Sequence, residues 1–336
     1  MAVTIYDVAK LAGVGLGTVS RVLNNSQNVK NSTRLKVKEA IRQLDFIPDP
    51  IARSMILGKT STIAVAVSYL TNPVTIEILR GIEAATRQRD YELLVYNLET
   101  EEQREDCLAR LPMSRKVDGL LLVSVVPDER AIERLHKTNL PAVLVDSFNP
   151  GLTSVVVNNR DGVYRGTRHL LNLGHTRIGF INGKNPNNFG VEQFCDRLAG
   201  FRQAYAEAGL GLDDDLIETT GWERECGGFA TARLLSLANP PTAILAASDL
   251  QAIGALEHCR ALQMNVPNDI SIMGFNGAKI SEWLKLTTVQ QPLFRLGEIG
   301  LNKLLEIIEN PAKEVELVCL DTTLALRQTT TRPRLY

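Results

Sequence analysis

The sequence has 336 residues and a formal net charge of -1, with 44% apolar and 22% charged residues. This length indicates more than one domain, and the composition is ordinary for a soluble globular protein. The longest apolar runs, such as residues 63–67 and 117–126, are too short to span a bilayer, and the first residues lack a secretory-signal pattern. Five widely spaced cysteines form no CxxC pair, so we expect reduced thiols and a cytoplasmic location without membrane association.

Charge is unevenly distributed along the chain. Residues 1–60 contain nine basic and four acidic side chains, so this segment carries a charge of +5 and the remainder carries -6. A small basic head on an acidic body favours a polyanionic partner for the head alone. A chance imbalance of surface charge would look the same, so the motifs have to decide between the two interpretations.

The first 45 residues predict three short helices. Thr4 is placed to cap the first helix, with Asp7 in its first turn, and Gly13 ends it. The apolar spacing predicts a second helix over roughly 16–24 and a third over about 32–45. Two short helices around a tight glycine-containing turn, braced by a third, describe a helix-turn-helix domain.

The second of these helices has a polar face that is suited to nucleic acid. Thr18, Ser20, Arg21 and Asn24 can hydrogen-bond phosphates or base edges, although a solvated helix face is the plain alternative. The glycines at 13, 15 and 17 have spacing similar to part of a dinucleotide-binding loop. That loop must follow a strand, whereas a helix precedes it here, so we reject the nucleotide interpretation.

A short helical segment is predicted after residue 48. Asp49 can cap it, Pro50 can occupy its first turn, and Gly58 ends it. A helix of this length is unstable alone in water, so we expect it to fold only against DNA or a partner helix.

From Ser61 onward, apolar β-branched runs alternate with amphipathic stretches, a pattern typical of doubly wound parallel sheets. About 275 residues exceed one such sheet, so we expect two similar α/β lobes with a ligand cleft at the carboxyl ends of their strands. The predicted strands are 63–67, 92–96, 119–124, 142–145, 155–157, 178–181, 243–246 and 271–275. The predicted helices include 76–89, 162–173, 198–208 and 251–263.

Catalytic and metal-binding motifs are missing from the sequence. It contains no P-loop, no HExxH and no GxSxG, and its four histidines have no paired metal-ligand spacing. We therefore expect neither an enzyme nor a metal or cofactor site.

The segments TIYDVAKLAGVGLGTVSRVLN and TRLKVKEAIRQLDFIPDPIARSM resemble the head of the lactose/galactose-repressor family of bacterial transcription regulators. Pieces such as LLNLGHTRIGFING, VPNDISIMGFN and LTTVQQP extend the resemblance over almost the whole chain. It implies an all-α helix-turn-helix head at 1–47, a hinge helix and linker at 48–60, and a two-lobed body at 61–336 that is similar to periplasmic binding proteins. The N-lobe would comprise about 61–160 and 291–321, and the C-lobe about 161–290 and 322–332.

The resemblance also implies which residues of the head and hinge contact DNA. Two departures from the family pattern matter: Gly15 stands where a capping Ser is usual, and Gly17 has no side chain with which to read a base. Met55 stands where members commonly place a leucine wedge for the minor groove. The implied DNA-binding set is Thr4, Leu16, Gly17, Thr18, Ser20, Arg21, Asn24, Ala52 and Met55.

For the body, the resemblance implies an effector cleft, and each of its key residues has an alternative role. Arg197 could form a surface ion pair, Trp222 could pack in the core, and Asp249 could cap a helix. Asn276 stands where sugar-binding members usually have Asp, and an aromatic pair is replaced at 74–75, so a neutral sugar is a weaker expectation than a general polar metabolite. The implied effector-binding set is Ser124, Asp146, Gln193, Arg197, Trp222, Asp249 and Asn276.

Taken together, the sequence predicts a ligand-responsive transcription regulator, expected to be a repressor. It would bind a pseudo-palindromic double-stranded DNA operator as a homodimer, because no leucine-heptad helix of the kind used for tetramers follows the body. A sugar, a sugar phosphate or a similar metabolite in the cleft would control its DNA affinity. Two alternatives stay open: a regulator switched by a phosphocarrier protein, and a solute-binding receptor without DNA function.

Overall fold

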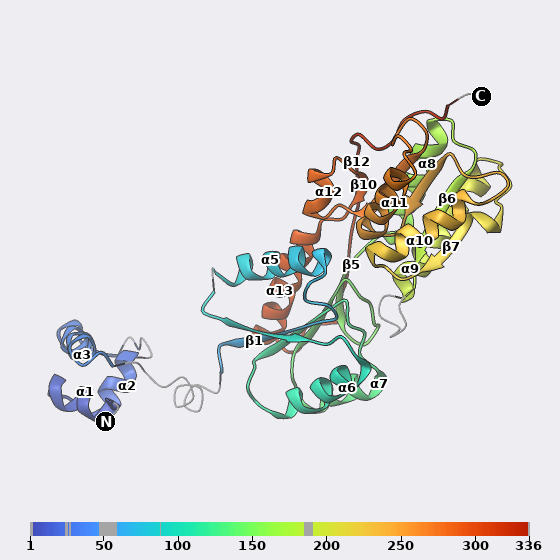
Figure 1. The fold of residues 1–336 in the computed structure, drawn as a ribbon. Coiled ribbons are helices and arrows are strands. Elements are labelled where there is room, and N and C mark those ends of the chain that lie inside the picture. Colours follow the sequence, from blue (N-terminus) through green and yellow to red (C-terminus); the bar gives the residue numbers. More distant parts are fainter. Residues whose placement is uncertain are drawn as a thin grey trace. The chain divides into compact units, whose positions relative to one another are not determined.

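The computed structural model describes residues 3–23, 26, 28–46, 59–87, 89–184 and 191–334. The chain divides into two compact units, residues 1–60 and 61–336, and each is described by itself (Figure 1). The predicted hinge helix, with Ala52 and Met55, lies outside the described residues, as does Asn24. Within the described ranges, no helix is both long and apolar enough to cross a membrane.

The described residues of the head form three helices, α1 (Ile5–Ala12), α2 (Leu16–Leu23) and α3 (Asn31–Gln43). Thr4 and Asp7 form the predicted cap: the Thr4 backbone N–H donates to Asp7 Oδ2 at 2.9 Å, and the Thr4 hydroxyl donates to the same oxygen at 2.7 Å. Gly13 ends α1 with a left-handed φ of 65°. The core of this unit is small and consists of Val8, Ala9, Val19, Val22, Val37 and Ala40.

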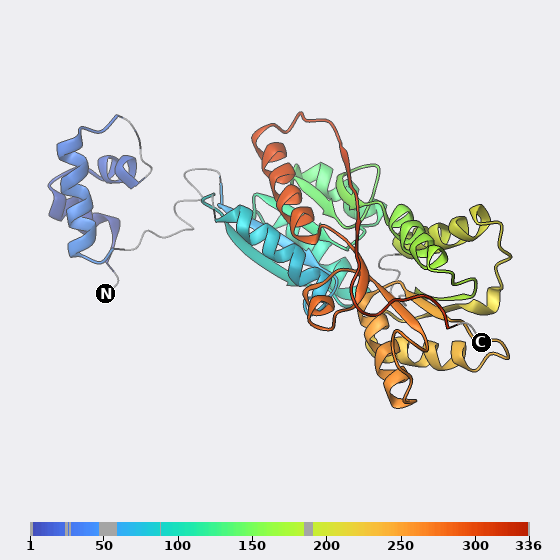
Figure 2. The same ribbon diagram turned by 90° about the horizontal axis from the view of Figure 1, so that it is seen from above.

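The body contains two six-stranded sheets, each sandwiched between helices. In the first sheet all neighbouring strands are parallel, in the order β11-β5-β4-β3-β1-β2. Helices α5 (Pro73–Thr86) and α13 (Leu293–Glu309) lie side by side on one face (Figure 2), and α6 (Glu101–Arg110) and α7 (Glu129–Thr138) cover the other (Figure 1). The strands are β1 (Thr62–Val67), β2 (Glu92–Asn97), β3 (Gly119–Val123), β4 (Ala142–Val145), β5 (Thr153–Val157) and β11 (Leu317–Leu320).

The second sheet has the order β12-β10-β9-β8-β6-β7, with only the pair β10–β12 antiparallel. Helices α8 (Asn159–Asn172) and α9 (Val191–Glu207) pack on one face, and α10 (Arg224–Leu235) and α11 (Asp249–Ala261) pack on the other. A short helix, α12 (Lys279–Trp283), follows β9. The strands are β6 (Ile178–Gly183), β7 (Ile217–Thr220), β8 (Ala243–Ala246), β9 (Ser271–Asn276), β10 (Thr287–Gln290) and β12 (Thr323–Ala325).

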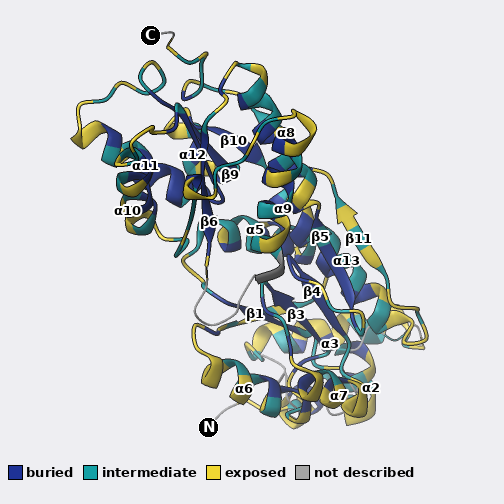
Figure 3. Ribbon diagram, turned by 90° about the vertical axis from the view of Figure 1, so that its right-hand side faces the viewer, coloured by how far each residue is buried: buried dark blue, intermediate teal, exposed yellow. Residues whose placement is uncertain are grey.

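Burial explains why the apolar runs of the sequence become central strands. Every residue of β3, β4 and β8 is buried, and β3 and β4 are dark blue in Figure 3. The edge strand β2 has only exposed and half-buried residues. Strands covered by helices on both faces read as continuous apolar runs. The predicted α/β class, with an all-α head and a doubly wound two-lobed body, is therefore confirmed.

The chain passes between the two sheets three times. One crossing joins β5 to α8, a second joins β10 to α13, and a third joins β11 to β12. Each lobe is therefore assembled from segments that are far apart in sequence. The boundary between the two lobes, where the chain crosses, is called the seam below.

Candidate functional site

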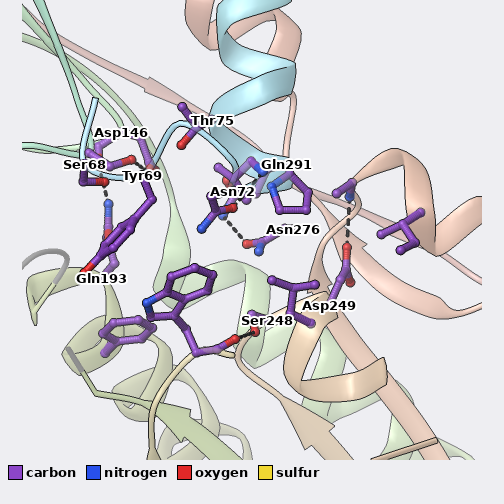
Figure 4. A pocket seen from close by; sticks show the side chains of 18 of the residues that line it. Ser68, Tyr69, Asn72, Thr75, Asp146, Gln193, Ser248, Asp249, Asn276 and Gln291 are labelled. Atoms are coloured by element: carbon purple, nitrogen blue, oxygen red, sulfur yellow. Dashed lines mark hydrogen bonds between the residues drawn. The ribbon is translucent and has the colours of Figure 1, made fainter. Parts of the chain in front are cut away.

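A pocket opens along this seam, at the carboxyl ends of strands from both sheets. All seven residues that were predicted to bind the effector line this pocket, although they lie in widely separated segments of the sequence. The free space between the lining atoms is about 800 Å³ when the open solvent at the mouth is included. Figure 4 shows Asp146 and Gln193 close together in this pocket and Asn276 beside Gln291.

The first lobe contributes Ser124 and Asp146, which directly follow β3 and β4. Both have a left-handed backbone, with φ of 53° and 57°, and residues in this region are concentrated at functional sites. The Ser124 hydroxyl donates to Asp146 Oδ2 at 2.8 Å. Asp146 Oδ1 is buried and has no hydrogen-bond donor among the described residues. Burial raises the pKa of the Asp146 carboxyl, although Ser124 and the charge of Arg197 oppose this rise.

Arg197 is held on three sides within the pocket wall. Its Nε donates to Asn159 Oδ1 at 2.9 Å, its Nη1 donates to the Ala247 carbonyl at 2.6 Å, and its guanidinium lies over the Phe275 ring. The residue is only 6% exposed, which excludes the surface ion pair that was the alternative interpretation. Burial lowers the pKa of Arg197 to about 10, although nearby carboxylates, Asp146 first, oppose this fall.

Asp249 has a different arrangement from the one that the sequence suggested. The cap of α11 is Ser248, whose hydroxyl oxygen accepts from the Gln251 N–H at 3.1 Å, so the alternative in which Asp249 caps this helix does not hold. Asp249 Oδ1 accepts from the Thr288 hydroxyl at 2.6 Å, and Oδ2 accepts from the Ala278 N–H at 2.9 Å. Both oxygens therefore join α11 to neighbouring segments, and burial raises the pKa of Asp249 to about 7.

An aromatic pair forms part of the pocket wall. Trp222 lies against Tyr69 with 5.2 Å between ring centroids and an interplanar angle of 55°. The Trp222 side chain is only partly buried, so it does not serve core packing alone. Tyr69 was not predicted, because it lies in a loop after β1 that carries no periodic signal. It supplies aromatic surface in a pocket where Val74 and Thr75 replace the family's aromatic pair.

Gln291 is a second pocket residue that the sequence reasoning missed. Its backbone N–H donates to the Asn276 carbonyl at 3.0 Å, and its side-chain Nε2 is 3.4 Å from Asn276 Oδ1. Gln291 Oε1 is buried and has no donor among the residues that the structure describes. Gln291 lies in the segment LTTVQQP, which resembles the family, but the sequence does not show that this segment crosses from one sheet to the other.

In the head, α2 presents a mixed surface. Arg21, Leu16 and Gly17 are exposed, and Thr18 and Ser20 are half-buried. The first turn of α2 bonds through the backbone, with the Thr18 N–H donating to the Gly15 carbonyl at 2.8 Å, and Gly15 has no side chain to cap the helix. Thr4 is exposed and belongs to the cap of α1.

A helix-turn-helix head joined to a two-lobed binding body with a polar interlobe pocket defines a class of ligand-sensing regulators. Residues 4–49 match the family described as bacterial regulatory proteins, lacI family, and residues 167–330 match the periplasmic binding protein-like domain. The chain is 32% identical to catabolite control protein A of Priestia megaterium over 337 residues, covering 98% of this chain and 100% of that protein. It is 33% identical to the ribose operon repressor of Escherichia coli K12, covering 96% and 98%.

Among solved structures, the lac repressor dimer bound to operator and an anti-inducer is similar, with a TM-score of 0.86 and 29% sequence identity, covering 98% of this chain and 100% of that one. The chain belongs to the LacI family of bacterial regulatory proteins. It is a transcription regulator rather than an enzyme, and as a regulator of bacterial genes it acts in the cytoplasm.

Proposed function

We propose that this protein is an effector-responsive repressor that binds a pseudo-palindromic operator as a homodimer. The observation that supports it most is the convergence of Ser124, Asp146, Gln193, Arg197, Trp222, Asp249 and Asn276 on one pocket between the lobes. The division into head (1–47), hinge (48–60) and two-lobed body (61–336) is part of this proposal.

In this proposal the effector acts by binding both lobes at once. Asp146 directly follows β4 of the first sheet, and Asn276 ends β9 of the second, so a ligand that bonds to both favours one lobe arrangement over another. A ligand shifts such an equilibrium only by its difference in affinity for the two states. The lobe arrangement would set the spacing of the two hinge segments in the dimer, and thereby the affinity for the operator.

The DNA contacts of the proposal fall on α2 and the hinge. Arg21 is the strongest candidate for reading a base, since it is exposed and arginine is the commonest reader of guanine. Leu16 offers an apolar contact for a thymine methyl group, and Thr18 and Ser20 offer hydroxyls to phosphates. The remaining proposed contacts are Thr4, Gly17, Asn24, Ala52 and Met55.

The test is a thermal-shift screen of the full chain against sugars, sugar phosphates and nucleobases, followed by operator binding with each ligand that raises the melting temperature. We expect a ligand that stabilises the protein also to change its operator affinity. A second preparation that lacks residues 1–58 should bind the same ligand and lose all DNA binding. The proposal fails if no duplex is preferred at moderate ionic strength, with or without ligand.

A further inference from the structure

The first sheet ends at β11, and this edge is open. Among the described strands, the only neighbour of β11 is β5. The Ser154 N–H of β5 donates to the Glu316 carbonyl at 2.9 Å, so the backbone of residue 316 faces β5. Backbone groups of successive residues in a strand alternate in direction, so the N–H and C=O groups of Leu317 and Cys319 face away from β5. Such a row of outward donors and acceptors is a template for another strand.

One row of side chains on β11 is apolar and exposed. Leu317 is 57% exposed, Cys319 is exposed, and Val315, two residues before the strand's first leucine, is 55% exposed. Val318 and Leu320 form the alternate row and pack against the core on the α13 side. Figure 3 shows β11 at the rim of its sheet, with exposed and half-buried residues only. The exposed row therefore adds apolar surface to an open backbone edge.

β11 lacks common features that prevent edge strands from pairing. Natural edges are protected by lysine side chains, by proline or by bulges. The strand Leu-Val-Cys-Leu contains no charged residue and no proline. The nearby Lys313 is held by Glu306 and Glu316, and Lys303 of α13 binds Glu316 at 2.6 Å. Both lysines are thus engaged with carboxylates, and the shortness of the strand is what limits pairing.

The sequence of this edge is complementary to itself in the antiparallel direction. With Leu317 opposite Leu317 of a second copy, Val315 faces the second copy's Cys319, and Lys313 faces the second copy's Asp321. Asp321 is exposed and has no ion-pair partner among the described residues, so its carboxylate can join Lys313. No two carboxylates lie directly opposite each other in this register, where like charges would be destabilising.

The size of the contact determines what it can do. Stable protein–protein interfaces bury about 1,200–2,000 Å², and a strand of four residues buries much less. Pairing is therefore reversible and needs a high local concentration, as when two assemblies are held on one DNA molecule. A two-fold contact uses the same surface on both copies, so each β11 edge joins one subunit to one other.

We infer that β11 is an interaction surface for a second copy of this chain, and that two copies pair β11 with β11 antiparallel to form one continuous sheet. In the proposed homodimer, this contact joins one dimer to another and brings two pairs of heads into one assembly. That last statement rests on the proposed function, whereas the strand pairing itself does not.

The first experiment locates the pairing by disulfide cross-linking of the full chain. Directly opposite residues of such a ladder have Cα atoms about 5.5 Å apart, which is within reach of a disulfide. Leu317→Cys combined with Cys319→Ser should give a covalent pair of subunits under mild oxidation, because residue 317 lies on the two-fold axis. Cys319→Ser alone is the control for the other thiols, including the exposed Cys195. A covalent pair that is no more abundant than in this control overturns the inference.

A second set of variants tests the register. Val315→Cys places a thiol opposite the native Cys319 of the second copy, so this variant should cross-link. Val315→Cys combined with Cys319→Ser should not, because two residues at position 315 are far apart in an antiparallel pair centred on Leu317. Equal cross-linking of both variants would indicate random collision of exposed strands and would contradict the proposed pairing.

The third experiment measures the mass of the full chain by sedimentation equilibrium over a range of concentrations. The mass should rise with concentration, and Leu317→Asp should raise the Kd of this step by about ten-fold, since two carboxylates would then face each other. Met113→Asp is the control, because Met113 is an exposed apolar residue of the same lobe, in the turn Leu111–Met113 after α6. A mass that does not change with concentration, or an equal Kd in both variants, overturns the inference.

DNA binding separates this inference from the proposed function. At protein concentrations below the Kd for pairing, Leu317→Asp should recognise duplex DNA as the parent protein does, because β11 carries none of the proposed DNA contacts. A parent protein that prefers no duplex defeats the proposed function and leaves the cross-linking result intact. Cross-linking that fails in a protein that recognises its operator defeats the strand pairing alone.

Discussion

The guanidinium carbon of Arg197 lies 4.1 Å from the centroid of the Phe275 ring, and this contact joins α9 to β9 in the second lobe. Together with the bonds to Asn159 and Ala247, it fixes the arginine before any ligand arrives. Orientation that is set in advance reduces the ordering cost of binding, so Arg197 is suited to recognise a ligand rather than to stabilise the surface.

Replacing Arg197 should abolish the effect of ligand binding on operator affinity. We expect Arg197→Ala to abolish the effector response while operator affinity without effector stays nearly intact. Arg197→Lys should also fail, since an ammonium cannot reproduce the planar fork or the stacking on Phe275. The matched control is Arg202→Lys, because Arg202 lies on the same helix as Arg197 but forms an exposed ion pair with Asp214. Operator binding measured by fluorescence anisotropy over an effector titration checks this, and a normal response in Arg197→Ala would refute the site assignment.

Operator affinity should fall steeply with salt, because each phosphate neutralised by the head releases counterions. In Arg21→Ala the slope of log affinity against log salt should become shallower by about one if the side chain contacts a phosphate, and sequence preference should relax if it contacts a base. Arg42→Ala is the control, since Arg42 is an exposed α3 residue that pairs with Glu39. A slope that is flat for the parent protein would argue against a DNA-binding head.

Asp249 should make the protein less stable as pH rises. Its pKa is raised from 3.8 to about 7 in the folded state, so the folded carboxyl holds a proton that the unfolded chain has already lost. The free energy of unfolding therefore decreases as pH rises through the folded pKa, by about 3 kcal/mol between pH 5 and pH 8 from this group. Urea denaturation at several pH values should show a smaller decrease in Asp249→Asn. An identical pH profile for the variant and the parent would rule out Asp249 as the source of the pH dependence of stability.

The crossing of α10 and α11 leaves no room for a methyl group at Gly254. A Cβ at this position would overlap the carbonyl of Arg224 on the neighbouring helix, which is backbone and cannot move aside alone. We expect Gly254→Ala to lower the free energy of unfolding by about 1–3 kcal/mol or more. Gly211→Ala is the control, since a Cβ there meets nothing within 4 Å. Equal stability of the two variants would show that the helices separate easily.

The sequence predicted eight strands from their apolar runs, and their bounds differ from the structure by at most two residues. Seven of the eight are largely buried, whereas β2 is a partly exposed edge strand. It missed β7, β10 and β12, which are three or four residues long and contain Thr. It also missed β11, which is apolar but only four residues long and partly exposed at the edge of its sheet. Helix starts were placed too late: α5 begins at Pro73 rather than 76, because Asn72 caps it and Pro73 follows. In α3, Leu35 belongs to the apolar pattern but is exposed.

Individual pocket residues were predicted only from the resemblance to the family. Tyr69 and Gln291 carry no local pattern, since their relevance comes from the folding of distant segments onto one seam. The hydrogen-bond partners of Asp249 likewise lie 29 and 39 residues away along the chain. Periodicity reports which side of an element is buried, but it does not report which distant polar group that side will meet.

The interleaved order of the lobes has a consequence for synthesis on the ribosome. The first sheet receives its last strand, β11, and one of its covering helices, α13, only after nearly all of the second sheet has been translated. One apolar face of the nascent first lobe therefore waits for α13, at translation rates of about 5–20 residues per second. Chains that terminate before residue 293 would leave the part of that face beside α5 uncovered and would be natural substrates for chaperones and proteases.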